Sequence, residues 1–475
     1  MKTIEGLYLI TDHNRDGQLK RRVKAALKGG TRIVQYRDKS RPASEQVDEA
    51  RDLRELCHKF GAIFLVNDDP ELALACEADG VHIGQGDSTI AEARKRLGHD
   101  RIIGMSTRTV EQALKAEMQG ADYVAVGSMF PTETKQDAVV VGIETLNKVR
   151  RAVKIPLVAI GGIDSNGASE ALDAGADAIA VISAVMGAAS PEVAARELSL
   201  LFNRRKPLPQ GRVLTVAGSD SGGGAGIQAD IKTITLLGGY ATSAITALTA
   251  QNTRGVSGIH PVTADFVGEQ IKAVLTDIGS DTIKTGMLFS PEIVAMVAQA
   301  IRRHSLIAVV DPVMIAKGGA PLLQQEAVEI LKVELLPETY LLTPNLPEAE
   351  ALTGLPVATE KDMEQAARKL QEMGARNVLI KGGHLKGDAV DLLLAGDTLH
   401  RLPAQRIATE NTHGTGCTFS AAIATYLTCG LPLVAAVRAA KTFITNAITT
   451  NTAIGSGHGP VNHYQAARKE PIQKS

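Results

Sequence analysis

Between residues 6 and 202, short apolar runs rich in β-branched residues alternate with longer segments that mix polar and apolar residues. Such runs predict buried strands, and the segments between them have the composition of helices. Eight strands are predicted, at 6–11, 33–38, 63–68, 80–85, 102–107, 123–128, 156–163 and 178–185. Eight βα units in roughly 200 residues is the number that closes a (β/α)8 TIM barrel. An open, doubly wound sheet is the alternative.

The alternation breaks near residue 203, where a charged segment carries Pro207 and Pro209. This composition is typical of a linker, although an ordered surface loop would look the same. Apolar runs then return at 212–217, 283–286, 307–311, 341–343 and 378–381, and they predict a second α/β domain with helices covering a central sheet. We therefore expect a barrel over 1–203, a linker over 204–211 and a second domain over 212–470.

Length and composition support this division and narrow the classes of function. A chain of 475 residues exceeds what one core usually organises. The formal net charge is −1, so nothing favours nucleic acid or an anionic membrane, and the 3% of aromatic residues argues against stacking on single strands. The four cysteines show neither metal-ligand spacing nor a disulfide pattern. No apolar run approaches the ~18 residues of a membrane span. We expect a cytoplasmic protein without nucleic-acid or membrane partners, and a homo-oligomer remains open.

Charged residues cluster at the carboxyl ends of the predicted barrel strands, where barrel enzymes place their chemistry. Arg37, Lys39 and Lys135 bring three cations to one mouth, and Asp68 and Asp87 bring two carboxylates suited to Mg²⁺. Because Mg²⁺ and cations bind phosphate oxygens, this set predicts a diphosphate site.

A second phosphate would suit the glycine pair Gly161-Gly162 and the backbone after the eighth strand, where N–H groups are exposed. Each of these features alone also has an ordinary structural interpretation as a strand end, a helix cap or a turn. Their agreement on strand-end positions favours a site for two phosphorylated ligands.

The motifs of residues 35–39 (QYRDK), 67–68 (ND), 80–87 (GVHIGQGD), 131–135 (PTETK) and 160–163 (IGGI) together resemble thiamine-phosphate synthase. The resemblance covers residues 4 to 200, in the order of that family. It implies that pyrimidine diphosphate binds to Gln35, Tyr36, Arg37, Asp38, Lys39, Asn67, Ser106 and Lys135, with Asp68 and Asp87 on Mg²⁺. It further implies that thiazole phosphate binds to Thr132, Glu133, Thr134, Gly162, Ile182 and Ser183, and that Lys135 has a catalytic role.

Two glycine-rich segments mark the second half. The first, at 217–226, lies between a predicted strand and a helix, and a plain turn is its alternative interpretation. In the second, Gly414, Thr415 and Gly416 precede a helix of small residues, so successive N–H groups would face an anion such as a migrating phosphoryl group. Cys417 at the helix start is predicted to have a lowered pKa and to act as a base, unless it is merely a buried small residue.

Other strand ends of the second half carry groups suited to Mg²⁺ and ATP. Asp311 ends one strand, Asn345 and Glu348 follow another, and Lys381 ends a third. Phosphoryl transfer depends mainly on positioning and charge neutralisation, which such groups provide.

This half resembles the ribokinase-like superfamily and, within it, the hydroxymethylpyrimidine/phosphomethylpyrimidine kinases. The resemblance spans about 212 to 464 and rests on residues 226–230 (GIQAD), 250–253 (AQNT), 286–288 (GML) and 411–418 (NTHGTGCT). It implies that the pyrimidine lies among Asp230, Gln251, Met287 and Val313, with Cys417 as the base. Sugar kinases of the superfamily carry Asp where Cys417 stands, and family members often carry Ser where Gly222 stands.

Together the two resemblances imply ATP-dependent phosphorylation of 4-amino-5-hydroxymethyl-2-methylpyrimidine to its monophosphate and diphosphate. The diphosphate would then condense with thiazole phosphate to give thiamin monophosphate and pyrophosphate. The fusion supports this, because the product of the second half is a substrate of the first. The alternatives are a pyridoxal-type vitamin kinase fused to a thiazole tautomerase-like barrel, and a non-catalytic metabolite sensor.

Overall fold

The computed structural model describes the chain apart from residues 1–2, 13–16, 133–138, 315–323, 386 and 470–475. It divides into two compact units, Met1–Phe202 and Asn203–Ser475. Within the described residues, no helix is both long and apolar enough to cross a membrane.

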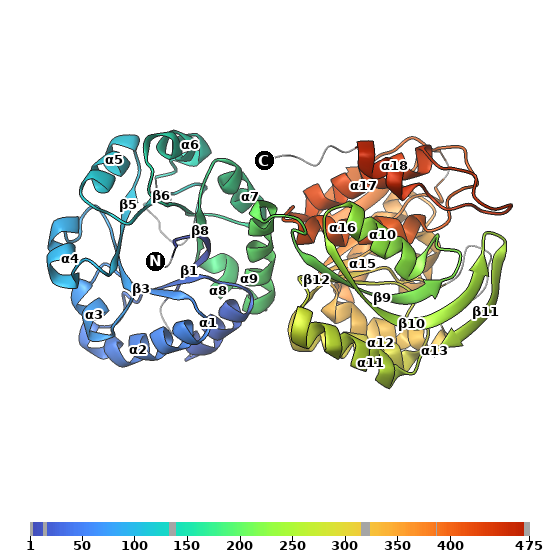
Figure 1. The fold of residues 1–475 in the computed structure, drawn as a ribbon, viewed down its shortest axis with the longest axis horizontal. Helices are drawn as coiled ribbons and strands as arrows, with labels where there is room; N and C mark the ends of the chain where they lie inside the picture. The colour runs from blue at the N-terminus through green and yellow to red at the C-terminus, as the bar shows by residue number, and fades with distance from the viewer. Residues whose placement is uncertain (1–2, 13–16, 133–138, 315–323, 386, 470–475) are drawn as a thin grey trace. The chain divides into compact units, whose positions relative to one another are not determined.

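Eight parallel strands close into a barrel in the first unit, and helices surround them (Figure 1). The barrel prediction is therefore confirmed, and the open sheet is excluded. The strands are β1 (Gly6–Ile10), β2 (Ile33–Tyr36), β3 (Ile63–Asn67), β4 (Gly80–Ile83), β5 (Ile102–Thr107), β6 (Tyr123–Gly127), β7 (Leu157–Ile160) and β8 (Ala178–Val181). The helices are α1 (Leu19–Lys28), α2 (Ala43–Lys59), α3 (Pro70–Ala75), α4 (Ile90–Leu97), α5 (Val110–Met118), α6 (Gly142–Ala152), α7 (Ser165–Asp173), α8 (Ser183–Met186) and α9 (Pro191–Leu200).

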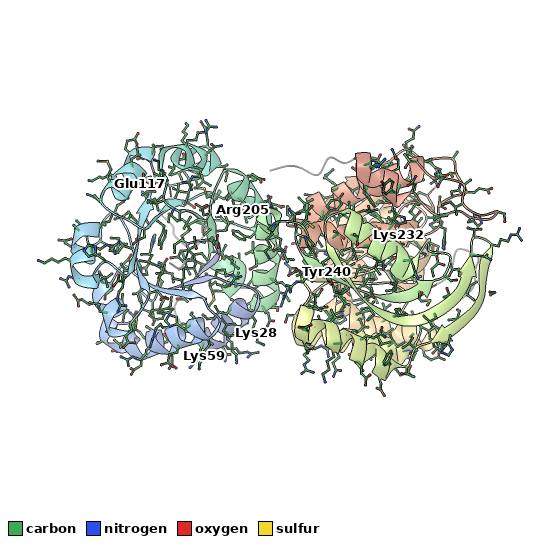
Figure 2. The ribbon with its side chains drawn as sticks, in the orientation of Figure 1. Lys28, Lys59, Glu117, Arg205, Lys232 and Tyr240 are labelled. Atoms are coloured by element: carbon green, nitrogen blue, oxygen red, sulfur yellow. The ribbon has the colours of Figure 1, made fainter. Side chains whose placement is uncertain are left out.

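Side chains on the barrel strands alternate between two apolar layers. Along β2, Ile33 belongs to the cluster that fills the barrel, whereas Val34 and Tyr36 belong to the cluster between the strands and the helices. This alternation follows from the period of two in a strand, and it places Gln35 inside. Side chains fill the space inside the barrel (Figure 2), so ligands have to bind at its mouth rather than in a pore.

Several barrel strands end sooner than the sequence predicted. β2 ends at Tyr36 and not at residue 38, β4 ends at Ile83, and β8 ends at Val181, after which Ser183 begins the short helix α8. The predicted site residues at these ends therefore lie on loops just beyond the strands, which is where barrel enzymes place reacting groups.

The second unit is built on one nine-stranded sheet in the order β11-β10-β9-β12-β13-β14-β15-β16-β17. Its strands are β9 (Arg212–Asp220), β10 (Tyr240–Asn252), β11 (Gly255–Pro261), β12 (Thr282–Thr285), β13 (Ile307–Val310), β14 (Leu341–Leu342), β15 (Asn377–Ile380), β16 (Asp391–Ala395) and β17 (Thr398–Leu402). The sequence predicted the central parallel strands and missed β10, β11, β16 and β17.

Helices lie on both faces of this sheet (Figure 1). The α-helices are α10 (Gly226–Leu236), α11 (Ala264–Ala273), α12 (Pro291–His304), α13 (Gln325–Ile330), α14 (Leu346–Thr353), α15 (Glu360–Glu372), α16 (Thr415–Thr428), α17 (Leu433–Thr449) and α18 (His463–Lys469). The shorter helical turns are η1 (Leu201–Arg205), η2 (Val274–Ile278), η3 (Leu331–Leu335) and η4 (Leu336–Glu338).

The segment around the expected linker is packed at its start. The Asn203 amide donates to the Thr428 carbonyl at 2.8 Å, and the Arg204 guanidinium donates to the Gly430 carbonyl at 2.7 Å. Residues 203 and 204 of η1 are thus held by hydrogen bonds to the end of α16 and the residues after it.

Candidate functional sites

Two carboxylates and a lysine lie close together at the barrel mouth. Lys39 Nζ lies 3.7 Å from Asp68 Oδ2, and Asp87 Oδ2 accepts a hydrogen bond from the Gly84 amide at 2.7 Å. Burial, together with the neighbouring Asp87, raises the pKa of Asp68 to about 6, although Lys39 opposes this. Asp68 also has a positive φ of 63°, a conformation that costs a non-glycine residue energy. The crowding of two carboxylates is relieved when a cation binds between them.

No group of three or more His, Cys, Asp or Glu side chains is arranged to hold a metal within the part of the chain that the structure describes. Mg²⁺ does not need three protein ligands, since one or two carboxylates and the substrate's phosphate oxygens usually hold it. Asp68 and Asp87 fit this role.

Gln35, Asn67 and Ser106 lie toward the carboxyl ends of β2, β3 and β5 and are anchored by hydrogen bonds. Gln35 Nε2 donates to Asn67 Oδ1 at 2.6 Å. Ser106 Oγ and His82 Nε2 are 2.9 Å apart. These bonds fix the three predicted side chains at the top of the filled barrel. His82 was missed in the sequence, where the inward position of a histidine on a strand was the available signal.

Arg37 lies beside this group on the β2 loop. Its backbone amide donates to Thr11 Oγ1 at 2.8 Å, and its guanidinium lies 4.0 Å from Asp12. The guanidinium is about one quarter exposed, so it remains accessible to an anionic ligand.

The side chains of Tyr36 and Asp38 are not part of the mouth. The Tyr36 hydroxyl donates to Glu49 Oε2 at 2.9 Å, and its ring stacks on Phe64 in the layer beneath the helices. Asp38 accepts from Arg41 Nε at 2.7 Å and is almost fully buried. The alternation along β2 turns the Tyr36 side chain outward, and Arg41 holds the Asp38 carboxylate, so these two residues can contribute to the predicted diphosphate site only through their backbone.

Only some of the residues expected to bind thiazole phosphate belong to the described part of the chain. Glu133, Thr134 and Lys135 lie outside the described residues, and Thr132 is the last described residue before them. Gly162 follows β7, while Ile182 and Ser183 form the start of α8 after β8. The seventh and eighth strand ends therefore present backbone at the positions that barrels use for phosphate.

In the second unit, the two glycine-rich segments are in direct contact. Gly414 is the N-cap of α16 with a φ of 78°, and a Cβ there would collide with the Gly224 carbonyl oxygen. His413 Nε2 lies 3.0 Å from Asp220 Oδ2, and Gln251 Nε2 lies 3.2 Å from the same ring nitrogen. The first segment thus packs against the turn before α16 and is not a plain connection.

Asp220 organises the first glycine segment. Its carboxylate accepts from the backbone amides of Gly222, Gly224 and Ala225 at 2.8 to 3.0 Å. Burial alone would raise the pKa of Asp220, but His413 and these amides hold it below its usual value. Lys232 on α10, labelled in Figure 2, donates to the Gly223 carbonyl at 2.6 Å.

The first turn of α16 presents Thr415, Gly416 and Cys417 beside a charged pair. Lys381 Nζ donates to Asp311 Oδ1 at 2.6 Å, and both groups lie 3.4 Å from where a Cβ on Gly416 would stand. A helix start with a lysine beside it suits an anion with several oxygens.

The prediction of a lowered pKa for Cys417 is wrong. Burial raises the pKa of its thiol to about 11, and the nearby Lys284 ammonium offsets only part of this effect. Cys417 is therefore a thiol in the free protein, because removing a thiolate from water costs more than the helix start and the lysine recover.

Asp230 is fully buried in an ion pair and does not present an open carboxylate. Lys284 Nζ donates to its two oxygens at 2.9 and 2.8 Å, and Thr215 Oγ1 donates to Oδ2 at 2.6 Å. Neither charged side chain has any exposed surface. The Asp230 carboxylate is thus held by Lys284 and Thr215, and its expected contact with the pyrimidine stays a prediction.

Asn345 and Glu348 form a capping box at the start of α14. Asn345 Oδ1 accepts from the Glu348 amide at 2.9 Å, and Glu348 Oε2 accepts from the Asn345 amide at 2.8 Å. Burial raises the pKa of Glu348 to about 7, against the lowering effect of Lys381. The pair therefore shapes the chain after β14, and the Glu348 carboxylate also accepts from the Met314 amide.

Met287 and Val313 follow the ends of β12 and β13, which are adjacent parallel strands. The Met287 methyl group packs against Gly218, and Val313 lines a small hollow with Asp311. Gln251, at the end of β10, lies beside His413, which precedes α16.

Comparison with known proteins agrees with this geometry. The family model for thiamine monophosphate synthase matches residues 7–185, and that for phosphomethylpyrimidine kinase matches residues 220–462. The thiamine biosynthesis bifunctional protein ThiED of Geobacter sulfurreducens is 55% identical over 98% of this chain and 95% of its own length.

The chain belongs to the bifunctional thiamine biosynthesis family. Its first half is a thiamine-phosphate synthase with a TIM barrel, and its second half is a hydroxymethylpyrimidine/phosphomethylpyrimidine kinase with a ribokinase-like fold. The two activities of this transferase serve thiamin biosynthesis, and the kinase uses ATP.

A pyridoxal kinase of Bacillus subtilis in an ADP complex is also similar to the second half, at 39% identity with a TM-score of 0.51. It covers 54% of this chain and 98% of its own. Over the same half, a hydroxymethylpyrimidine/phosphomethylpyrimidine kinase of Rhizobium meliloti is 52% identical and covers 53% of this chain and 96% of its own. The higher identity favours the pyrimidine over pyridoxal.

Proposed function

We propose that the barrel mouth between β2 and β5 holds the pyrimidine diphosphate. The crowding of Asp68, Asp87 and Lys39 is the observation that carries this assignment. Arg37 and Lys39 neutralise the diphosphate, and Asp68 and Asp87 hold Mg²⁺, which supplies further charge neutralisation when it is bound. Gln35, Asn67 and Ser106 contact the pyrimidine from the adjacent strand ends.

The thiazole phosphate is proposed to bind opposite, at the seventh and eighth strand ends. Gly162, Ile182 and Ser183 offer backbone groups there, and the resemblance adds Thr132, Glu133 and Thr134. Pyrophosphate leaves before the new bond forms, and its charge is offset by Arg37, Lys39 and Lys135. The thiazole nitrogen then captures the pyrimidine carbocation, so no protein nucleophile is needed.

Lys135→Ala tests the synthase assignment. Because this ammonium is proposed to stabilise departing pyrophosphate, we expect the turnover number to fall about 100-fold while the KM for thiazole phosphate stays nearly constant. Steady-state assay of thiamin monophosphate formation measures both. An unchanged turnover number refutes the role of Lys135.

In the kinase half we propose that Gly414, Thr415 and Gly416 bind the migrating phosphoryl group, with Lys381 beside it. Asp311 holds Lys381 in place, and Glu348 lies on the same side. Gln251, Met287 and Val313 face the pyrimidine, and Mg²⁺ accompanies ATP, as in other phosphoryl transferases. Cys417 receives the hydroxyl proton while phosphoryl transfer proceeds.

Because Cys417 is a thiol in the free protein, it first gives its proton to solvent, and the resulting thiolate then takes the proton of the substrate hydroxyl. The buried Lys284 ammonium provides the positive charge that favours the thiolate. Cys417→Ala should therefore reduce phosphorylation of the alcohol at least 100-fold and leave pyrimidine binding nearly intact. ATP-consumption assays and calorimetric titration measure the two effects, and full activity in this variant would make the thiol structural.

The combined function is tested by incubating the purified chain with ATP, Mg²⁺, hydroxymethylpyrimidine and thiazole phosphate. Thiamin monophosphate is the expected product. If the diphosphate accumulates instead and is never coupled, the barrel assignment fails while the kinase assignment stands.

A further inference from the structure

A continuous chain of buried hydrogen bonds crosses the inside of the barrel beneath the mouth. Tyr8 on β1 donates from its hydroxyl to Gln35 Oε1 at 2.6 Å, and the hydroxyls of Tyr8 and Tyr123 are 2.9 Å apart. Tyr123 on β6 lies 2.9 Å from His82 Nδ1, whose other ring nitrogen reaches Ser106. With the bond from Gln35 to Asn67, the chain links two mouth residues on different strands.

The direction of the first bond determines the direction of the others. Since Tyr8 gives its only proton to Gln35, its oxygen accepts from Tyr123, and Tyr123 then accepts from the Nδ1–H of His82. The neutral ring carries no second proton, so its Nε2 accepts from the Ser106 hydroxyl. The ring is buried inside the barrel and stacks on Tyr123 with 5.5 Å between the ring centroids, where a charge would be costly.

The same argument determines which side-chain atoms of Asn67, at the other end of this series of hydrogen bonds, accept and which donate. Its carbonyl oxygen accepts from Gln35, so its amide can only donate toward the mouth, where it already hydrogen-bonds to the Asp68 carboxylate. Ser106 in turn directs its proton inward and leaves only oxygen lone pairs for the mouth. The series of hydrogen bonds thus leaves one donor at Asn67 and an acceptor at Ser106 for a ligand.

We propose that His82, held in its Nδ1–H form by Tyr123 and Tyr8, is a positioning residue that makes Ser106 a hydrogen-bond acceptor for the 4-amino group of the pyrimidine. This proposal rests on the binding of pyrimidine diphosphate at this mouth. The 4-amino group is the only N–H donor of that substrate, while its ring nitrogens and diphosphate oxygens accept, as the amide of Asn67 requires. A pyrimidine with another group at this position would leave Ser106 unpaired.

These hydrogen-bonded polar side chains occupy space inside the barrel that apolar side chains would otherwise fill. The surrounding interior consists of residues such as Ile33, Leu65 and Val158, whereas the two tyrosines and His82 are polar and buried. Gly104 on β5 leaves the space for the Tyr123 ring, since a Cβ there would collide with it. Buried polar groups in an apolar layer are costly unless each is paired, and here each has its partner.

The test compares two competitive inhibitors of the synthase reaction in the full-length chain, with ATP omitted so that the kinase half makes no product. The probes are hydroxymethylpyrimidine monophosphate and its analogue with hydrogen in place of the 4-amino group. The wild type should bind the amino probe about tenfold more tightly, since one hydrogen bond separates them. Ser106→Ala should remove this preference.

Variants of His82 form a matched pair. His82→Gln places an amide near the position of Nε2 and should keep most of the preference, whereas His82→Asn reaches only the position of Nδ1 and should lose it. Tyr123→Phe keeps His82 beside Ser106 but frees its tautomer, so the preference should fall several-fold. An unchanged KM for thiazole phosphate shows in each variant that the barrel is folded.

Two outcomes overturn the proposal in distinguishable ways. If His82→Asn and Tyr123→Phe both keep the wild-type preference while Ser106→Ala loses it, the hydrogen-bond chain does not orient Ser106. If Ser106→Ala and Asn67→Ala leave the binding of both probes unchanged, the pyrimidine does not bind at this mouth, and the proposed site itself is wrong.

Discussion

At the residue scale, burial decides the protonation of the groups around both sites. It lowers the pKa of His82 to about 4, raises that of Asp68 to about 6 and raises that of Cys417 to about 11. In each case desolvation is the largest cause, and neighbouring charges modify it. In the free protein His82 is therefore a neutral imidazole, Asp68 ionises only near pH 6, and Cys417 is a thiol.

The neutral state of His82 gives a prediction for stability. In the unfolded chain a histidine has a pKa of about 6.5, so between this value and about 4 the unfolded state binds more protons than the folded state. Stability should therefore decrease as the pH falls through this window. The contribution of His82 lost between about pH 7 and pH 5 is about 2 kcal/mol.

Urea unfolding followed by circular dichroism measures this effect, with His82→Gln as the control because glutamine does not titrate. The free energy of unfolding of the barrel should decrease by about 2 kcal/mol less in the variant than in the wild type over that interval. Equal decreases would mean that His82 is already protonated in the folded barrel.

The sequence predicted which residue types lie at the sites better than it predicted their protonation and their ion-pair partners. Lysine, arginine and aspartate at strand ends indicated phosphate chemistry, and Asp68 and Lys39 do lie together. The sign of the pKa shift of Cys417 was missed, because a helix start is visible in the sequence whereas desolvation depends on packing. The ion pair of Asp230 was missed because its partner Lys284 lies 54 positions away in the sequence.

At the element scale, strand ends and helix starts position both sites. The eight barrel strands were predictable because their apolar runs are regular, but β2, β4 and β8 end earlier than those runs. The hairpin strands β10, β11, β16 and β17 were missed, since much of β10 and β11 is exposed and lacks a continuous apolar run. The turn before α16 was identified correctly as a helix start.

Gly414→Ala tests the turn before α16. A side chain there needs a positive φ and collides with the Gly224 carbonyl, so the two glycine segments must move apart. We expect the kinase rate to fall at least tenfold while the synthase rate stays unchanged.

Gly258→Ala in β11 is the control, because a Cβ there makes only an ordinary contact with Ala250. ATP consumption and thiamin monophosphate formation, measured in one preparation, report the two rates. A wild-type kinase rate in Gly414→Ala would show that this turn does not bind the migrating phosphoryl group.

At the scale of the whole molecule, two units with separate cores carry two consecutive reactions. The sequence indicated this division through the break near residue 203, and the shared intermediate connected the two halves. Because each site is built within one unit, its residues should be dispensable for the other reaction.

Complementation between two inactive variants tests this central claim most directly. Cys417→Ala and Lys135→Ala are each given hydroxymethylpyrimidine, ATP, Mg²⁺ and thiazole phosphate, alone and then mixed in equal amounts. Alone, neither variant should form thiamin monophosphate at more than about one hundredth of the wild-type rate, whereas the mixture should recover a large share of it. If the mixture stays inactive although Cys417→Ala couples supplied diphosphate normally, the two reactions do not occur at two independent sites.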